Sequence, residues 1–210
     1  KNPEYGNILR SVELNRLPMG VLGLSHIHKA HLIAALTKDT ARNALVITPD
    51  ESQALRLVRD LNAMGAEAVL YPARDFNFRS SEGQSREYEH IRLGVLHGLS
   101  ESQGDIVVCS AEAALQLTIP PDTLKNSSIT LSPGKEISPI TLIAQLIRAG
   151  YVRADLAEGA GQFAFRGGIL DIFPPSSEQP FRLEFWGDTI ELLTRFDPDT
   201  QRSIEKVKKI

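Results

Sequence analysis

The sequence is short of the residue types that would point to several common classes of protein. It contains one cysteine, Cys109, in 210 residues, which excludes an intrachain disulfide and fits a reducing compartment such as the cytoplasm. We expect no signal peptide and no membrane association, because no apolar run is long enough to cross a bilayer. The 23 basic and 26 acidic side chains give a net charge of −3 without a basic block. That balance argues against strong non-specific nucleic-acid binding, which depends on neutralising phosphates.

The first 120 residues alternate short apolar runs with segments of helical periodicity. The apolar runs that predict strands are residues 19–22, 44–48, 68–71 and 105–110. The segments that predict helices are residues 29–36, 51–64 and 85–99. Short apolar strands bounded by turn residues suit a parallel sheet that is buried on both faces. The sequence therefore predicts an α/β domain over residues 1–120.

The pattern changes near the Ile-Pro-Pro-Asp stretch at residues 119–122. A helix is predicted at residues 139–149, and strands are predicted at residues 128–131, 162–165, 169–173, 181–186 and 189–196. One helix against an antiparallel sheet predicts a smaller α+β module over residues 121–204. We expect residues 205–210 to begin a return of the chain to the first domain, and the sequence to be part of a longer protein.

The segment GLSHIHKA, residues 23–30, has the position expected of a phosphate-binding loop, G-x-x-x-x-G-K-[ST]. Gly23 and Lys29 match that pattern. His28 stands where a second glycine lets the backbone approach the phosphates, and Ala30 stands where a hydroxyl would bind Mg²⁺. We therefore expect no ATP hydrolysis at this segment, whether it is a vestigial loop or a chance similarity.

Residues 50–53, Asp-Glu-Ser-Gln, imitate a helicase DExx box. In that box the aspartate ends a strand, whereas here Pro49 separates the strand from Asp50 and a helical pattern begins at once. A helix cap by Asp50 or Ser52, with Glu51 at the positive helix end, explains these residues without catalysis.

Two further groups of residues could carry chemistry. His26, His28 and His31 could suggest a metal site, but no nearby cysteine or fourth ligand supports it, so ordinary loop and helix histidines are the favoured interpretation. Cys109 ends an apolar run, which favours a buried strand cysteine over a nucleophile.

Residues 151–203 combine arginines with aromatic side chains. Arg153, Arg166 and Arg182 each lie close to aromatic residues along the chain. These residue types are enriched at protein interfaces, and the many acidic residues of the same segment favour a protein partner over a phosphate backbone. The alternative is an ordinary sheet whose aromatics fill the core and whose arginines are solvated.

The stretch GQFAFRGGILDIFPPSSEQPFRLEFWGDTIELLTRFDPDTQRS closely resembles the UvrB-homologous module of the bacterial transcription-repair coupling factor family. The pattern G-x-F-x-x-R-G-x-[IL]-[IL]-D-[IL]-F-P, followed by R-[IL]-[ED]-F-[FW]-x-D-x-I-E, is long and specific. The stretch YPARDFNFRSSEGQSREYEHIRLGVL resembles the segment between the early strands of the same family. The resemblance implies a degenerate helicase-like (P-loop NTPase-like) parallel-sheet domain joined to a smaller α+β module like the second domain of UvrB.

The resemblance also implies a partner. The second domain of both families binds UvrA, so this region would be a non-catalytic adaptor that recruits nucleotide excision repair to stalled RNA polymerase. The residues that the resemblance assigns to UvrA binding are Arg153, Phe165, Arg166, Leu170, Arg182 and Glu184. The UvrB turn, F-R-V-R-G, has a further arginine where this chain has Ala164, so one contact must differ.

The same resemblance implies which activities this region lacks. The loop containing Gly23, His28, Lys29 and Ala30 would be inactive, and the long DNA-clamping hairpin of UvrB has no room between Tyr71 and Ser85. No cofactor is expected here, because ATP would serve only the C-terminal motor of a parent DNA translocase. Contacts with RNA polymerase and DNA would use parts absent from this sequence, and the motor domains would mask the UvrA site intramolecularly.

Three alternatives remain at this point. The chain could be a UvrB-like ATP-dependent helicase fragment that binds nucleotide and damaged DNA. It could be a nucleic-acid-binding module, whose affinity should fall steeply with salt. It could be a metal-binding protein built on the three histidines.

Overall fold

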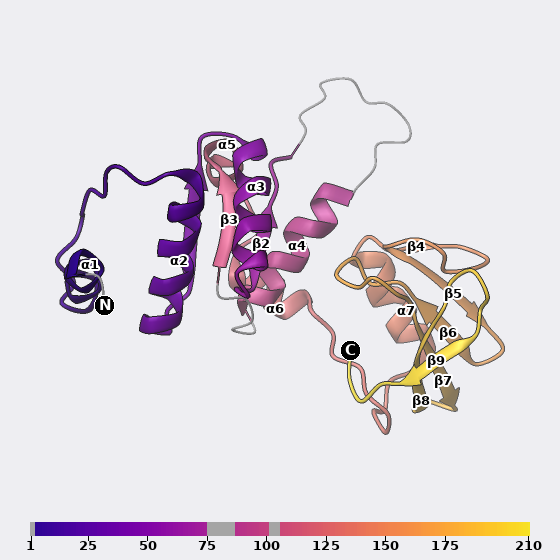
Figure 1. Cartoon of the computed structure of the whole chain (residues 1–210). Coiled ribbons are helices and arrows are strands. Elements are labelled where there is room, and N and C mark those ends of the chain that lie inside the picture. Colours follow the sequence, from indigo (N-terminus) through magenta and orange to yellow (C-terminus); the bar gives the residue numbers. More distant parts are fainter. Residues whose placement is uncertain (1–2, 75–86, 101–105) are drawn as a thin grey trace, which may run out of the picture. The chain divides into compact units, whose positions relative to one another are not determined.

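The chain folds as two compact units, Lys1–Thr118 and Ile119–Ile210. The structure, a computed structural model, describes residues 3–74, 87–100 and 106–210 (Figure 1). Three expectations fall partly outside these ranges. They are the missing hairpin before Ser85 and the first residues of the helix and strand predicted at 85–99 and 105–110.

The first unit contains a three-stranded parallel sheet. Its helices are α1 (Pro3–Glu13), α2 (His26–Thr40), α3 (Glu51–Ala63), α4 (Glu87–Ser100) and α5 (Ala111–Leu115). Its strands are β1 (Ala44–Thr48), β2 (Ala68–Tyr71) and β3 (Ile106–Ser110), in the order β1-β3-β2. Both pairings are parallel, so the predicted α/β class and parallel sheet are confirmed for this unit.

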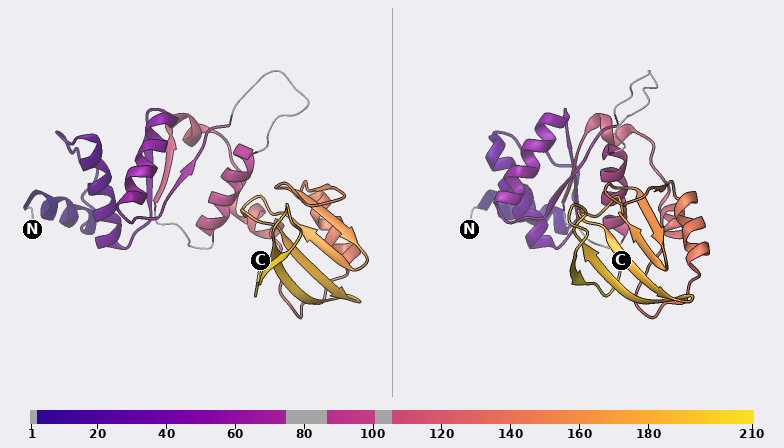
Figure 2. Two further views of the ribbon diagram at one scale, coloured as in Figure 1. Left: turned by 45° about the vertical axis from the view of Figure 1, so that its right-hand side comes forward. Right: turned by 90° about the vertical axis from the view of Figure 1, so that its right-hand side faces the viewer.

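Helices cover both faces of this sheet, with α2 and α3 on one side and α4 on the other (Figure 2). Ile106 and Val108 of the central strand pack with Leu57 and Leu61 of α3. The alternate residues, Val107 and Cys109, form a second cluster that includes residues of α4. Contact on both faces explains why β3 is an uninterrupted apolar run.

The strand predicted at residues 19–22 is absent. The chain has no helix or strand between α1 and α2, and Leu22 is almost fully exposed. Pro18 has no N–H to donate to a neighbouring strand, and Gly20 offers no side chain to pack against a sheet. Four apolar residues therefore do not form a strand here.

The second unit is one helix packed on a six-stranded sheet. Its helices are α6 (Pro121–Ser127) and α7 (Pro139–Arg148). Its strands are β4 (Val152–Arg153), β5 (Gln162–Arg166), β6 (Ile169–Ile172), β7 (Phe181–Trp186), β8 (Thr189–Phe196) and β9 (Ser203–Lys206). They lie in chain order, with β4 parallel to β5 and all later neighbours antiparallel.

The α7 helix begins with Pro139 in its first turn and buries Leu142 and Leu146 against the sheet. Those leucines pack with a set of side chains that alternate along the strands: Phe163, Leu170, Ile172, Phe181, Leu183 and Leu193. The intervening residues must point away from α7, because successive side chains of a strand face opposite sides. That second face carries the polar residues considered below.

The strand predicted near the start of this unit is wrong. Residues 128–131 form no strand, although Leu131 exchanges two backbone hydrogen bonds with Ile210, at 2.8 and 2.9 Å. Residues 205–210 lie in the second unit, where β9 pairs with β8. A return of the chain to the first domain stays a prediction.

In the part of the chain that the structure describes, no helix is long and apolar enough to cross a membrane.

Candidate functional site

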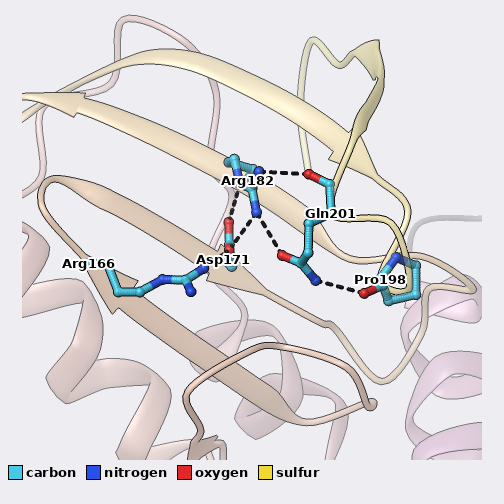
Figure 3. Close-up of polar contacts among 5 residues, drawn as sticks. All are labelled: Arg166, Asp171, Arg182, Pro198 and Gln201. Atoms are coloured by element: carbon cyan, nitrogen blue, oxygen red, sulfur yellow. Dashed lines mark hydrogen bonds and ion pairs between the residues drawn. The ribbon is translucent and has the colours of Figure 1, made fainter.

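The polar face of the second sheet is organised around a buried carboxylate, that of Asp171 in β6. Its side chain is 1% exposed, and it lies opposite Arg182 of β7 in the strand register. The carboxylate accepts from Arg182 Nε at 2.7 Å and from Arg182 Nη2 at 2.8 Å (Figure 3). Arg166 Nη2 adds a longer contact of 3.2 Å to Oδ2. One buried acid is therefore shared by two arginines.

Arg182 is enclosed by this arrangement. Its side chain is 16% exposed, its Nη1 donates to the backbone oxygen of Gln201 at 3.1 Å, and its guanidinium lies 4.4 Å from the ring centre of Phe196. The hydrogen bonds to Asp171 raise the pKa of Arg182 despite the opposing effect of burial. Paired charges of this kind hold the sheet together and offer little to a partner.

Arg166 is the accessible member of the pair. It ends β5 beside the two-residue turn formed by Gly167 and Gly168, whose φ angles are +55° and +88°. Two positive φ angles are those of a tight hairpin turn, which glycine adopts without strain. The side chain of Arg166 is 53% exposed, and Asp171 engages only its Nη2. The remaining N–H groups can bind a carboxylate on another protein.

Trp186 extends this face with an apolar surface. It is 77% exposed at the end of β7, and the preceding residue, Phe185, donates its N–H to Gly168 at 2.9 Å. Since Phe185 packs toward the core, Trp186 must point the other way, next to the turn that carries Arg166. Sequence analysis did not select Trp186. The alternation of Phe181, Leu183 and Phe185 along β7 is the signal that could have found it.

The six residues assigned to UvrA binding by resemblance do not all lie together. Arg166, Arg182 and Glu184 share the face away from α7, where Glu184 pairs with Ile169 and Ile169 pairs with Arg166. Phe165 and Leu170 face α7, and Leu170 is fully buried in the core. Arg153 is exposed on β4, and the register places it beside Phe163 rather than near Arg166.

The segment that imitates a phosphate-binding loop forms part of a helix. Ser25 lies at the N-cap position of α2 without a side-chain capping bond, and the backbone N–H of Lys29 donates to Ser25 O at 3.0 Å within the first turn. His28 Nδ1 lies 3.0 Å from Ser25 Oγ. Ala30, at the position where a phosphate-binding loop has its metal-binding hydroxyl, is fully buried against α3 in the core.

The acidic pair at residues 50–51 is structural. Asp50 accepts from the N–H of Gln53 at 2.8 Å and from its side-chain amide at 2.7 Å. These bonds lower the pKa of Asp50. Glu51 accepts from the N–H of Ala73 at 3.1 Å, which joins the start of α3 to the end of β2. The interpretation of Asp50 as a helix cap is confirmed.

The histidines and the cysteine also have structural surroundings. His26 Nδ1 lies 2.9 Å from Asp60 Oδ2, while His28 is beside Ser25 and His31 is exposed. No three His, Cys, Asp or Glu residues gather as a metal site within residues 3–74, 87–100 and 106–210. Cys109 is buried in β3, and that burial raises the pKa of its thiol.

Comparison with known proteins identifies relatives along the whole chain. Residues 129–210 match the family described as UvrB interaction domain, which includes the entire Asp171 face. The transcription-repair-coupling factor of Bacillus subtilis is 31% identical over 212 residues that include 100% of this chain. That of Escherichia coli is 32% identical over 183 residues, 86% of this chain. The chain belongs to the transcription-repair-coupling factor family.

The chain covers only part of the length of the relatives that it matches. It spans 18% of the Bacillus subtilis protein and 16% of the Escherichia coli protein. Myxococcus xanthus has a further relative, 29% identical over 90% of this chain. The part of the chain that matches the UvrB interaction domain carries Arg166 and Arg182.

The two arginines of the Asp171 face should differ in their effect on stability. Arg182→Ala leaves the buried Asp171 with one weak partner, so we expect it to lower the free energy of unfolding by about 3 kcal/mol. Arg166→Ala leaves the bidentate Asp171–Arg182 pair intact and should change the free energy of unfolding by less than about 0.5 kcal/mol. Urea denaturation of the two variants measures the difference. Equal losses would show that Asp171 does not depend mainly on Arg182.

The buried position of Ala30 gives a second prediction. Ala30→Thr forces a larger, polar side chain into a packed site, and we expect a loss of about 1–3 kcal/mol in urea denaturation. Lys29→Thr at the exposed neighbouring position is the control, with an expected loss of less than about 1 kcal/mol from helix propensity. Similar small losses for both variants would contradict the burial of Ala30.

Proposed function

We propose that this chain is a non-catalytic adaptor region that binds UvrA through the exposed half of the Asp171 face. The observation that carries the proposal is that a half-exposed arginine, Arg166, and an exposed tryptophan, Trp186, point away from α7 on strands that meet at the Gly167–Gly168 turn of a UvrB interaction domain. Arginine and tryptophan are the residue types that most often dominate the energy of protein interfaces.

The chemistry of this face defines what UvrA would have to present. Arg166 suits a carboxylate, which it can bind with its free N–H groups. Trp186 suits an apolar pocket from which water is excluded. Glu184, on the same face, suits a basic side chain at the rim. Arg182 would act by holding Asp171, and the exposed Arg153 would be at most peripheral.

In the full-length protein, we propose, this region recruits nucleotide excision repair to stalled RNA polymerase. The parent would be an ATP-dependent DNA translocase that contacts RNA polymerase and DNA through other regions. Its motor domains would mask the UvrA-binding face until they engage. The support for these roles is the resemblance to the coupling factors, whose relatives are much longer than this chain.

We further propose that the first unit is a helicase-like scaffold whose phosphate-binding loop is degenerate. A working loop has a hydroxyl residue for Mg²⁺ where this chain has the buried Ala30. The N–H of Lys29 donates to a backbone oxygen within the first turn of α2. The acids that imitate a DExx box are engaged in hydrogen bonds to the backbone. These features argue against the alternative of a nucleotide-dependent helicase fragment.

Titration calorimetry with UvrA tests the docking face. We expect Arg166→Ala and Trp186→Ala each to weaken binding by about 2–4 kcal/mol, a loss of roughly 30- to 1,000-fold in affinity. Arg148→Ala, which removes an exposed arginine at the end of α7, is the control and should bind as the wild type does. Wild-type affinity for both face variants would move the site elsewhere, and absence of binding by the wild type would refute the adaptor role.

Nucleotide binding tests the degenerate loop separately. We expect the 210-residue chain to show no saturable binding of ATP with Mg²⁺ at millimolar concentration, because no hydroxyl ligand stands at position 30. Fluorescence titration with a labelled ATP analogue, competed with unlabelled ATP, measures this. Competable binding that is lost in Lys29→Ala would support a working nucleotide site instead.

A further inference from the structure

The connection between β8 and β9 is a self-contained loop that lies against Arg182. Asp197 Oδ1 accepts from the N–H of Thr200 at 2.7 Å and from the N–H of Asp199 at 3.0 Å. The backbone closes the loop, since the N–H of Gln201 donates to Asp197 O at 2.8 Å and the N–H of Asp197 donates to Arg202 O at 2.9 Å. The loop therefore holds Gln201 in a defined place (Figure 3).

Gln201 presents two acceptors to one guanidinium. Its backbone oxygen and its Oε1 each lie 3.1 Å from a terminal nitrogen of Arg182. Its own amide nitrogen donates to Pro198 O at 2.7 Å, which fixes which end of the side-chain amide faces Arg182. The φ of Gln201 is +60°, a conformation that residues other than glycine adopt only where neighbouring contacts support it.

These contacts determine which of the two arginines forms the stronger hydrogen bonds to Asp171. Arg182 donates hydrogen bonds to Asp171 from Nε and Nη2. It donates to Gln201 from Nη1 and Nη2, so hydrogen bonds hold both edges of the guanidinium. While Arg182 occupies both oxygens of Asp171, Arg166 keeps only its single 3.2 Å contact. An Arg182 released from Gln201 could turn, and Asp171 would then draw Arg166 into a closer pair. Arg166 would be less available at the surface.

We propose that Gln201 is a positioning residue for the docking face: by holding Arg182 on Asp171, it keeps the guanidinium of Arg166 presented to a carboxylate of the partner. The inference rests on the proposed UvrA-binding role of Arg166 and assigns a part in it to the β8–β9 loop, whose Gln201 is hydrogen-bonded to Arg182. Gln201 itself need not contact the partner.

The first test observes the arginines in the chain alone. Gln201→Gly removes the amide and relieves the positive φ, so we expect it to fold. In arginine-labelled protein, NMR should show the Arg182 Nε–H exchanging with water several-fold faster in Gln201→Gly than in the wild type. Asp199→Ala, an exposed position in the same loop, should leave the exchange unchanged. Equal exchange in the wild type and Gln201→Gly would overturn the inference.

The second test measures coupling to Arg166 by titration with UvrA. We expect Gln201→Gly to weaken binding by about tenfold, within the range of couplings between residues of one network. In an Arg166→Lys background the same change should weaken binding by less than about twofold, because an ammonium has no planar fork to orient. An equal loss in both backgrounds would indicate a general structural effect and contradict positioning.

The outcomes separate the inference from the function on which it rests. If the wild type does not bind UvrA, the proposed function fails and the positioning role fails with it. If the wild type binds and Arg166→Ala does not, while Gln201→Gly binds normally, the function stands and the inference alone is wrong.

Discussion

The pairing of Asp171 with Arg182 is the interaction on which the functional face depends. A carboxylate that is 1% exposed in the middle of a sheet is costly unless it is fully hydrogen-bonded, and Arg182 meets that need through two short contacts. Because Arg182 provides the hydrogen bonds that the buried Asp171 needs, Arg166 is not required for that purpose. A half-exposed arginine with one weak internal contact can then stand at a tight glycine turn, on the same face of the sheet as an exposed tryptophan.

Much of the second unit could be predicted from the sequence because its signals are local. The strands Phe181–Trp186 and Thr189–Phe196 have the bounds that alternation and the Gly187-Asp188 turn predict. The helix at Pro139–Arg148 ends one residue before its predicted end. The strand predicted at residues 19–22 was wrong because apolar character alone does not supply a neighbouring strand to pair with. The exposed Leu22 shows that no strand covers this segment.

The functional face was only partly predictable because it depends on register and on distant residues. A motif could mark Arg166, Arg182 and Glu184, but it could not show that Leu170 in the same stretch points into the core. Asp171 gains its role from a residue 11 positions away, and Arg182 meets Gln201 across 19 positions. No periodicity in the sequence encodes such contacts, and the pairing of β5, β6 and β7 together with the β8–β9 loop brings these residues together.

We propose that UvrA docks on the face bearing Arg166 and Trp186, and not on the helix side. Hydrogen–deuterium exchange of the chain, alone and saturated with UvrA, would map the contact without any substitution. We expect slower exchange concentrated at the β5–β6 turn and at the end of β7, with α7 unchanged. Slower exchange confined to α7 or to the first unit would contradict it.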